Sequence, residues 1–393
     1  MINDFKKIIY DSTFCYNLVI RNGEGCIIED IDGNKYIDFT SNIAASPLGY
    51  AHPEVMRVLK EYANNGVNKI AGQDFYCEEH FQIAKKLLSI SPNGFKAFLV
   101  NSGAEAVENS LKLAYKKKGP LPGISFEKSF HGRTLGALSV TSSKDVQKNN
   151  FPELPVKRLK FCTNEIDPEI DRIERIIKNN KIAFIITEII QGEGGIFIAS
   201  NRFIKEISKI AKNYDVPLIF DEVQTGLGRT GKWWAYQHYG VLPNIITTAK
   251  ALQVGAVTFE NKYDPMERGV LSSTWGGGGR IDMAIGAKMI DVIERDGLLE
   301  NSCKMGNKII KQLMEFTGQE IIHDVRGKGL MIGIEVSKQD FRDKIILNLF
   351  KKGLLVLPAG EKTIRILPPL IIDEKTISEG LEIFHQVIKK FNR

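Results

Sequence analysis

An aspartate and a lysine, each placed at the end of a short apolar run, are the residues of this sequence whose setting most suggests chemistry. Asp221 follows the run VPLIF at 216–220, and Lys250 follows the run NIITT at 244–248 by two residues. A lysine amine can form a Schiff base with an aldehyde, and a buried carboxylate can keep a pyridine nitrogen protonated. Pyridoxal phosphate chemistry uses these two protein groups, so we expect a chain that moves amino groups.

Each of the two residues also has an ordinary explanation when it is taken alone. A carboxylate at the end of a strand can face water, and most lysines are solvated surface charges. The setting favours function, because VPLIF is typical of a buried parallel strand and ligands bind beyond the carboxyl ends of such strands. Partial desolvation of Lys250 would also lower its pKa toward the range in which the neutral amine is available.

The elements that must position these residues form an alternating pattern. From about 50 to 280, short apolar runs alternate with helical patterns, which predicts an α/β fold with a mostly parallel, doubly wound sheet. The segment 23–39 alternates around Asp32-Gly33 and predicts a β-hairpin. A long helical pattern at 283–316 and short strands beyond it suit a smaller α+β unit. We expect residues 1–48 and 281–393 to build the smaller domain and 49–280 the large cofactor-binding domain.

Composition limits the classes of function. The chain has 393 residues, 43% hydrophobic and 25% charged, as in globular proteins. No apolar run approaches the roughly 20 residues of a membrane span, and the first residues do not resemble a secretory signal, so we expect a cytoplasmic protein. The net charge of +6 comes from scattered residues and does not require nucleic acid. The 5 cysteines lack a CxxC pair, which indicates reduced thiols and no metal site.

Two glycine-containing loops could bind phosphate. The sequence GLGRTG at 226–231 matches a dinucleotide-binding pattern, but no helix pattern follows it and no acid lies at the required distance, so an ordinary loop is the better interpretation. Ser102-Gly103-Ala104 follows a strand and opens a helix, which suits a phosphate at a helix N-terminus. Simple helix capping by Ser102 explains the same pattern equally well.

Three further segments carry polar residues at strand ends or in apolar surroundings. Phe130-His131-Gly132-Arg133 places an aromatic face near a guanidinium, which could stack on a planar ligand and hold a carboxylate. Glu188 and Glu193 follow the buried run KIAFII and could reach the same crevice as Asp221. Arg365 lies among apolar residues and needs a partner if it is buried, for which Glu193 is a candidate.

Eight motifs, in order along the chain, together resemble those of one enzyme family. They are NSGAEAVE, FHGRT, EIIQGEGG, IFDEVQTGLGRTGK, the Lys250 segment, STWGGG, VRGKGLMIGIE and IRILPPL. The sequence is similar to the class III (ω-amino acid) aminotransferases of the fold type I pyridoxal-phosphate superfamily over nearly its whole length. KALQVGAVTF and STWGGG look more like the lysine 6-aminotransferase branch, whereas IGIEV and RILPPLII look equally like acetylornithine or 4-aminobutyrate enzymes.

The resemblance implies a cofactor, pyridoxal 5'-phosphate, and the residues that hold it. Lys250 would be the Schiff-base lysine and Asp221 the partner of the pyridine nitrogen. Thr274 would reach the phosphate from a neighbouring subunit, which makes a homodimer with shared sites the expected assembly. The other residues implied in cofactor binding are Ser102, Gly103 and Ala104 at the phosphate, Phe130 and Val223 on the two ring faces, Gln224 near the ring hydroxyl, and His131 and Glu188.

The resemblance also implies a substrate site. Arg133 would hold the distal carboxylate of the substrate, and Arg365 the α-carboxylate of glutamate. Glu193 would cover Arg365 when an ω-amino acid is bound and move aside for glutamate. The expected activity is a ping-pong transfer of a terminal amino group, from a lysine-, 4-aminobutyrate-, ornithine- or acetylornithine-type donor, to 2-oxoglutarate, which gives an aldehyde and glutamate.

An amino acid racemase or aminomutase on the same scaffold is the alternative activity. Its cofactor site would contain the same lysine, aspartate and phosphate-binding residues. The set of Arg133, Glu193 and Arg365 favours transfer, because a racemase has no second, dicarboxylate substrate to accommodate.

Overall fold

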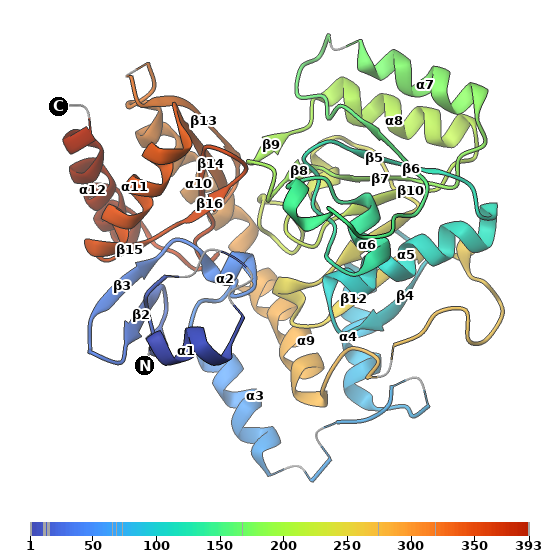
Figure 1. Ribbon diagram of the computed structural model, residues 1–393. Helices are drawn as coiled ribbons and strands as arrows, with labels where there is room; N and C mark the ends of the chain where they lie inside the picture. Colours follow the sequence, from blue (N-terminus) through green and yellow to red (C-terminus); the bar gives the residue numbers. More distant parts are fainter. Residues whose placement is uncertain are drawn as a thin grey trace.

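A seven-stranded sheet lies at the centre of the larger part of the molecule (Figure 1). The computed structural model describes residues 2–10, 13, 16–64, 66–67, 69–72, 74–166, 168–273, 275–318 and 320–391. Neighbouring strands are parallel from β6 to β11, and β12 pairs antiparallel with both β11 and β4. The mostly parallel α/β sheet predicted from the sequence is therefore confirmed. Across the sheet the strands are β4 (Phe95–Val100), β12 (Gly255–Glu260), β11 (Ile245–Thr248), β10 (Leu218–Asp221), β7 (Ile185–Glu188), β5 (Gly123–Phe126) and β6 (Val156–Leu159).

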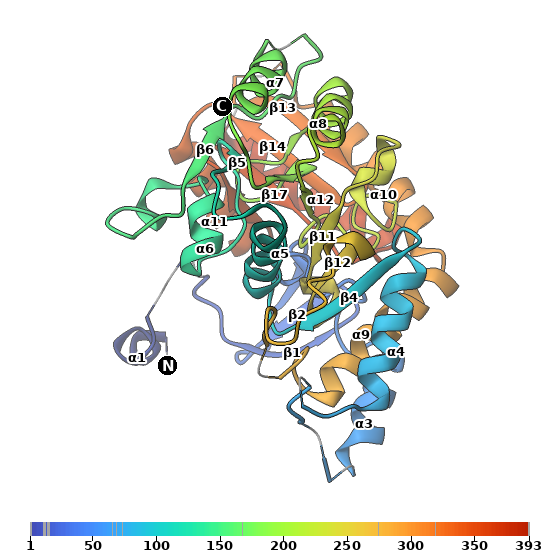
Figure 2. The same cartoon turned by 90° about the vertical axis from the view of Figure 1, so that its right-hand side faces the viewer.

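Helices cover this sheet and explain its apolar strands. Every residue of β7, β10 and β11 is buried, as expected for parallel strands that have layers on both faces. Helix α5 packs on β11 and β12, and α4 packs on β4 and α9 (Figure 2). The helices of this part are α4 (Glu78–Ser89), α5 (Gly103–Lys118), α6 (Leu135–Val140), α7 (Glu169–Asn179), α8 (Asn201–Asn213) and α9 (Arg280–Arg295), with 3₁₀ turns η1 (Asp145–Gln147), η2 (Ala235–His238), η3 (Lys250–Leu252) and η4 (Asn261–Tyr263).

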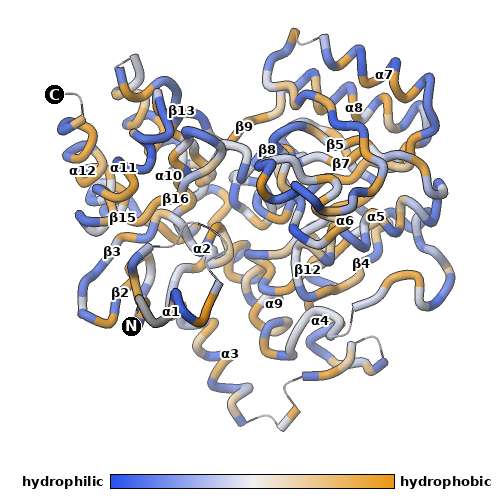
Figure 3. The backbone as a smooth tube through the Cα atoms, viewed as in Figure 1, coloured by the Kyte–Doolittle hydropathy of each residue, from blue (hydrophilic) through white to orange (hydrophobic). Residues whose placement is uncertain are grey.

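The sequence of α8 shows why these helices form where they do. Ser200 caps the helix, because its hydroxyl accepts a hydrogen bond from the amide of Phe203 at 3.2 Å. The buried residues of the helix recur at three- and four-residue spacing and include Ile204 and Ile207. Figure 3 shows the resulting alternation of hydrophobic and hydrophilic residues along α7 and α8.

The two ends of the chain meet in the smaller part of the molecule, where their segments lie side by side in Figure 1. The hairpin predicted around Asp32-Gly33 is present as β2 and β3, and β3 pairs in parallel with β15 from the C-terminal segment. One sheet contains β1 (Ile20–Glu24), β2 (Ile27–Asp30), β3 (Lys35–Asp38) and β15 (Leu354–Leu355), and another contains β13 (Ile322–Lys328), β14 (Met331–Val336), β17 (Thr363–Ile366) and β16 (Leu357–Ala359). The helices here are α10 (Leu298–Met314), α11 (Gln339–Lys351) and α12 (Glu374–Phe391). Helix α1 (Ile2–Ile8) precedes β1 in the chain, and α3 (Pro53–Ala63) packs on α9.

Two features differ from the pattern seen in the sequence. The long helical pattern at 283–316 forms two helices, α9 and α10, because Gly297 between them has a left-handed φ of 62° that no helix continues. Strand β12 runs antiparallel to its neighbours, which the alternation of strands and helices did not indicate.

Among the described residues, no helix has both the length and the apolar character needed to cross a bilayer.

A left-handed turn, labelled α2 (Ser41–Ala44), follows β3. Its residues have φ values between 39° and 69°, including 51° at Asn42 and 59° at Ile43. Such angles are unfavourable for residues with a Cβ atom, by roughly 1–2 kcal/mol each. The buried hydroxyl of Ser41 helps to hold the turn, because it donates to the carbonyl of Leu367 at 2.6 Å and accepts from Arg229 at 3.2 Å.

Gly286 of α9 fixes how closely this helix approaches the turn η3. A Cβ atom at Gly286 would lie 2.2 Å from the carbonyl oxygen of Leu252, a backbone atom that cannot rotate away. Gly286→Ala should therefore destabilise the protein by about 1–3 kcal/mol, although alanine is normally favoured over glycine in helices by about 1 kcal/mol. Thermal unfolding measures the effect, with the exposed Glu294→Ala on the same helix as the control. An unchanged or raised melting temperature for Gly286→Ala would contradict this packing.

Candidate active site

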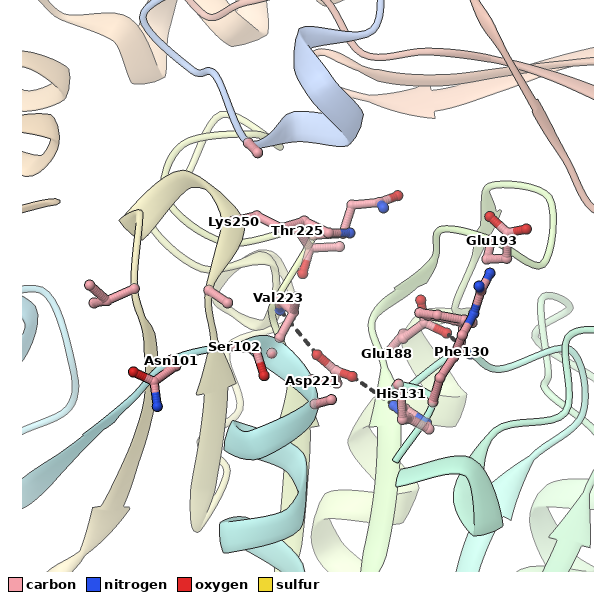
Figure 4. Close-up of a pocket in the computed structure, with 18 of the residues that line it drawn as sticks. Asn101, Ser102, Phe130, His131, Glu188, Glu193, Asp221, Val223, Thr225 and Lys250 are labelled. Atoms are coloured by element: carbon pink, nitrogen blue, oxygen red, sulfur yellow. Dashed lines mark hydrogen bonds and ion pairs between the residues drawn. The ribbon is translucent and has the colours of Figure 1, made fainter. Parts of the chain in front are cut away.

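A cavity of about 500 Å³ opens at the carboxyl ends of β7 and β10 (Figure 4). Strand-end residues of the sheet meet there with the loops that follow α2, β5 and β11. The residues predicted for the site that line this cavity are Ser102, Gly103, Ala104, Phe130, His131, Arg133, Glu188, Glu193, Asp221, Val223, Gln224 and Lys250. Thr274 lies outside the described residues. The structure therefore brings these predicted residues together, and Arg365, which is not among the lining residues, contacts two of them, Glu193 and Gln224.

Three polar contacts orient the carboxyl group of Asp221. One oxygen lies 2.7 Å from Nδ1 of His131, and the other accepts from the amide of Val223 at 3.0 Å and from the hydroxyl of Thr247 at 3.1 Å. Asp221 is only 4% exposed, so these contacts replace the water that burial removes. Figure 4 shows the carboxyl group between His131 and Val223. Its orientation in the cavity is thus set before any ligand binds.

Lys250 begins η3 directly after β11 and has a left-handed φ of 47°. Burial lowers the pKa of its amine to about 8, and the nearby guanidinium of Arg365 acts in the same direction, against the opposite effect of Asp221, Glu188 and Glu193. A substantial fraction of the amine is therefore neutral near pH 8. The turn is held to the N-terminal segment by Gln253, whose side-chain amide donates to the carbonyls of Ala45 at 2.7 Å and Lys250 at 3.0 Å.

The start of α5 shows the capping role considered for Ser102. Its hydroxyl caps the helix, because it accepts from the amide of Glu105 at 3.2 Å. The first amides of a helix have no acceptor within it, and those of Gly103 and Ala104 belong to residues that line the cavity. A Cβ atom at Gly103 would lie 2.9 Å from Val223, so glycine allows the helix start to approach the Asp221 loop. This helix start can hold an anion.

Glu188 connects two of the loops that form the cavity. Its carboxyl oxygens accept from the amide of Phe130 at 3.0 Å and from that of Gly192 at 2.8 Å. Burial raises the pKa of Glu188 to about 7, while His131 lowers it and Asp221 raises it further. Arg133 lies at the rim, exposed, with its guanidinium 5.8 Å from the centre of the Phe130 ring.

Arg365 and Glu193 form the ion pair that the sequence suggested. Nη2 of Arg365 lies 3.4 Å from Oε2 of Glu193, and Nη1 lies 3.4 Å from Oε1 of Gln224. The Arg365 side chain is 4% exposed, and burial lowers its pKa while Glu193 raises it. A second carboxylate that approaches the same edge of the guanidinium would compete with Glu193 for it.

Several residues of the site were not predicted. Thr247 pairs with Asp221 across β10 and β11, so alignment of the two strands could have identified it. Thr225, also not predicted, lines the cavity as well, together with Ala45 from the segment 41–46 and Asn101 just before the start of α5. Among the described residues, no group of His, Cys, Asp and Glu side chains could hold a metal ion.

Comparison with known proteins identifies the family. The family model for aminotransferase class-III matches residues 10–388. The chain belongs to this family. It is 34% identical to the acetylornithine aminotransferase of Caldanaerobacter subterraneus subsp. tengcongensis, over 99% of both chains. It is 35% identical to the [LysW]-aminoadipate semialdehyde/glutamate semialdehyde transaminase of Sulfolobus acidocaldarius, over 95% of both chains.

The solved structures agree with this family assignment. A lysine aminotransferase from M. tuberculosis superposes with a TM-score of 0.91 at 27% identity, over 98% of each chain. The ornithine aminotransferase from Toxoplasma gondii, at 24% identity and a TM-score of 0.88 over 99% of this chain and 95% of that one, shares the fold. The chain is thus a class III aminotransferase with the fold type I architecture.

The raised pKa of Glu188 predicts a pH dependence of stability. Its ordinary value is 4.5 and the folded value is about 7, so between these values the folded protein holds a proton that the unfolded chain releases. The stability that Glu188 contributes is therefore present below pH 4.5 and is lost as the pH rises through 7. Glu188→Gln stays neutral, so its melting temperature relative to the wild type should rise between pH 5 and 7.5 by the equivalent of about 2 kcal/mol. The exposed Glu379→Gln is the control, and a constant difference for Glu188→Gln would refute the prediction.

Proposed function

We propose that this aminotransferase uses pyridoxal phosphate to transfer the terminal amino group of an acetylornithine- or ornithine-type amino acid to 2-oxoglutarate. The observation that carries this proposal is the buried Arg365, paired with Glu193 in the wall of a cavity that contains Lys250. An arginine that a neighbouring carboxylate can cover suits a site that accepts two substrates, one with a single carboxylate and one with two. The names of the similar curated proteins support the same class of donor.

The residues of the cavity fit pyridoxal phosphate. The carboxyl group of Asp221 is buried and oriented by His131 and Thr247, which suits a partner for a protonated ring nitrogen. When bound, the cofactor supplies an electron sink for the carbon that carries the amino group. The first amides of α5 would hold its phosphate, together with Thr274 of a neighbouring subunit. Phe130 and Val223 would contact the two ring faces, and Gln224 the ring hydroxyl.

Lys250 would move the proton on which transfer depends. Its amine, with a pKa lowered to about 8 by burial, is available in the neutral form as a base. We propose that Nζ of Lys250 would take the proton from the substrate carbon and hold it for its return. Arg365 helps to keep the amine neutral by its positive charge, which lowers the same pKa.

The two arginines would distinguish the two substrates. Arg133 at the rim would hold the carboxylate farthest from the reacting amine in both substrates. For the ω-amino donor, Glu193 neutralises Arg365; for glutamate, Glu193 moves away and Arg365 binds the α-carboxylate. A racemase has no need of this arrangement, and the similar curated proteins are aminotransferases.

We further propose a homodimer with shared sites. The proposal rests on Thr274, expected from the family resemblance to complete the phosphate site of the neighbour. Exposed aromatic side chains near α4 also suit a contact with a second copy, since Phe75 is 64%, Tyr76 101% and Phe81 65% exposed.

A panel of amino donors tests the proposed activity. N-acetylornithine, ornithine, lysine and 4-aminobutyrate are each incubated with enzyme and 2-oxoglutarate, and glutamate is measured. We expect N-acetylornithine or ornithine to give the highest kcat/KM and Lys250→Ala to give no product, with the exposed Lys262→Ala as the control. Inversion of an amino acid without glutamate formation would favour a racemase instead.

The pair of Arg365 and Glu193 predicts opposite effects on the two half-reactions. Glu193→Gln should slow the half-reaction with the ω-amino donor about tenfold or more, because an uncovered Arg365 misplaces the donor. Arg365→Gln should instead slow the half-reaction with glutamate by a similar factor. Single-turnover absorption changes with each substrate alone measure both rates. Equal losses in the two half-reactions, for each variant, would mean that no such switch operates.

A further inference from the structure

The carboxylate of Glu193 lies between two cations. Its Oε2 is 3.4 Å from Nη2 of Arg365, and its Oε1 is 2.6 Å from Nζ of Lys144. The contact with Lys144 is the shorter of the two. Because different oxygens face the two cations, the carboxylate bridges them, and a small rotation can weaken one contact while it keeps the other.

The backbone that carries Glu193 is held in place. Glu193 lies in the turn of a two-stranded hairpin formed by β8 (Ile190–Gln191) and β9 (Phe197–Ile198). Its carbonyl accepts from the amide of Gly360 at 2.7 Å, and the carbonyl of Gly195 accepts from Arg326, also at 2.7 Å. Movement of the carboxylate away from Arg365 therefore requires rotation of the side chain rather than displacement of the loop.

The two cations differ in their freedom to follow the carboxylate. Arg365 lies within β17, with its side chain 4% exposed and with Gln224 as a second partner. Lys144 lies between α6 and η1, and its side chain is 41% exposed. The backbone near Lys144 is anchored, because the amide of Ser142 donates to the carbonyl of Ser129 at 2.8 Å. Lys144 can thus accompany Glu193 toward solvent, whereas Arg365 cannot.

We propose that Lys144 is a positioning residue that retains Glu193 when a dicarboxylate substrate takes its place on Arg365. The inference rests on the proposed function of the pair formed by Glu193 and Arg365. When Glu193 leaves Arg365, its carboxylate keeps Lys144 as a partner. Without Lys144, the carboxylate would lose its only cationic partner. Lys144 favours the open arrangement because, once Glu193 has turned from Arg365, both of its carboxylate oxygens can face Nζ and the contact with Lys144 strengthens. The glutamate half-reaction therefore depends on Lys144 more than the half-reaction of the ω-amino donor, which binds with Arg365 covered.

The expected effect is modest because Lys144 is partly exposed. Exposed ion pairs contribute little, and their loss corresponds to roughly two- to fivefold changes in an equilibrium constant. Lys144→Gln should weaken the binding of glutarate, a five-carbon dicarboxylate without an amine, by about this factor. KM for 2-oxoglutarate should rise similarly, whereas kcat/KM of the donor half-reaction stays within experimental error. Lys144→Arg should restore glutarate binding.

Calorimetric titration of the holoenzyme with glutarate tests the inference in a double-mutant cycle. The four proteins are the wild type, Lys144→Gln, Glu193→Gln and the double variant. Lys144→Gln should have no effect in the Glu193→Gln background, since Lys144 is proposed to act through that carboxylate. A general attraction of dicarboxylates by the lysine charge would persist in that background and would overturn the proposal. Lys116→Gln is the control, because Lys116 on α5 has a similarly exposed side chain, 46%, and also pairs with a carboxylate, that of Glu267.

The outcomes separate this inference from the proposed function. If Glu193→Gln changes the two half-reactions differently but Lys144→Gln changes neither glutarate binding nor KM for 2-oxoglutarate, the role of Lys144 is refuted and the switch stands. If Glu193→Gln changes both half-reactions equally, the switch fails and the role of Lys144 fails with it. Equal losses for Lys144→Gln in both half-reactions would also refute the inference, because they would indicate a general structural effect.

Discussion

Burial of the Asp221 carboxyl group at the end of β10 is the constraint on which the site depends. A charged group in an apolar sheet is unfavourable unless fixed partners replace water. His131, Thr247 and the amide of Val223 provide these partners, and each comes from a different part of the site: the loop after β5, the neighbouring strand β11, and the turn after β10. Correct pairing of the parallel strands is therefore needed before the carboxyl group can be accommodated. In this way the fold and the proposed chemistry share one requirement.

The electrostatics of Lys250 follow from the same arrangement. Burial and Arg365 lower the pKa of its amine, while the carboxyl groups of Asp221, Glu188 and Glu193 oppose them. The result, about 8, lies between that of a solvated lysine and that of a lysine buried without acids nearby. A base with a pKa close to the working pH can both accept and return a proton. Each of these charged groups thus affects the pKa of the Lys250 amine, in addition to the contacts that the group makes itself.

The sequence allowed the parallel strands and their polar ends to be predicted, because apolar runs and the residues that follow them are local signals. These signals drew attention to Asp221, Glu188 and Lys250, and the resemblance to class III aminotransferases added Gln224 and Val223; all of these residues line the cavity. The antiparallel course of β12 was not predicted, since strand direction depends on tertiary packing. Lys144 was missed for a similar reason: it lies in the polar segment TSSKDVQKNN, where nothing distinguishes it from a surface lysine. Only the folded chain places it beside Glu193.

The chemistry of the three cations Arg365, Lys144 and Arg133 fits their positions. Arg365 is deeply buried, and an arginine keeps its charge there more readily than a lysine, whose pKa falls when it is desolvated. A lysine in its place would lose charge where a carboxylate must bind. Lys144, in contrast, is partly exposed, so its charge does not depend on a buried partner, and its flexible chain can follow a moving carboxylate. Arg133 at the rim suits a planar, two-point contact with a carboxylate that enters from solvent. In the proposed switch, a buried arginine beside the cavity and a partly exposed lysine beside the turn would give Glu193 two unequal positions, and the substrate that binds to Arg365 would decide between them.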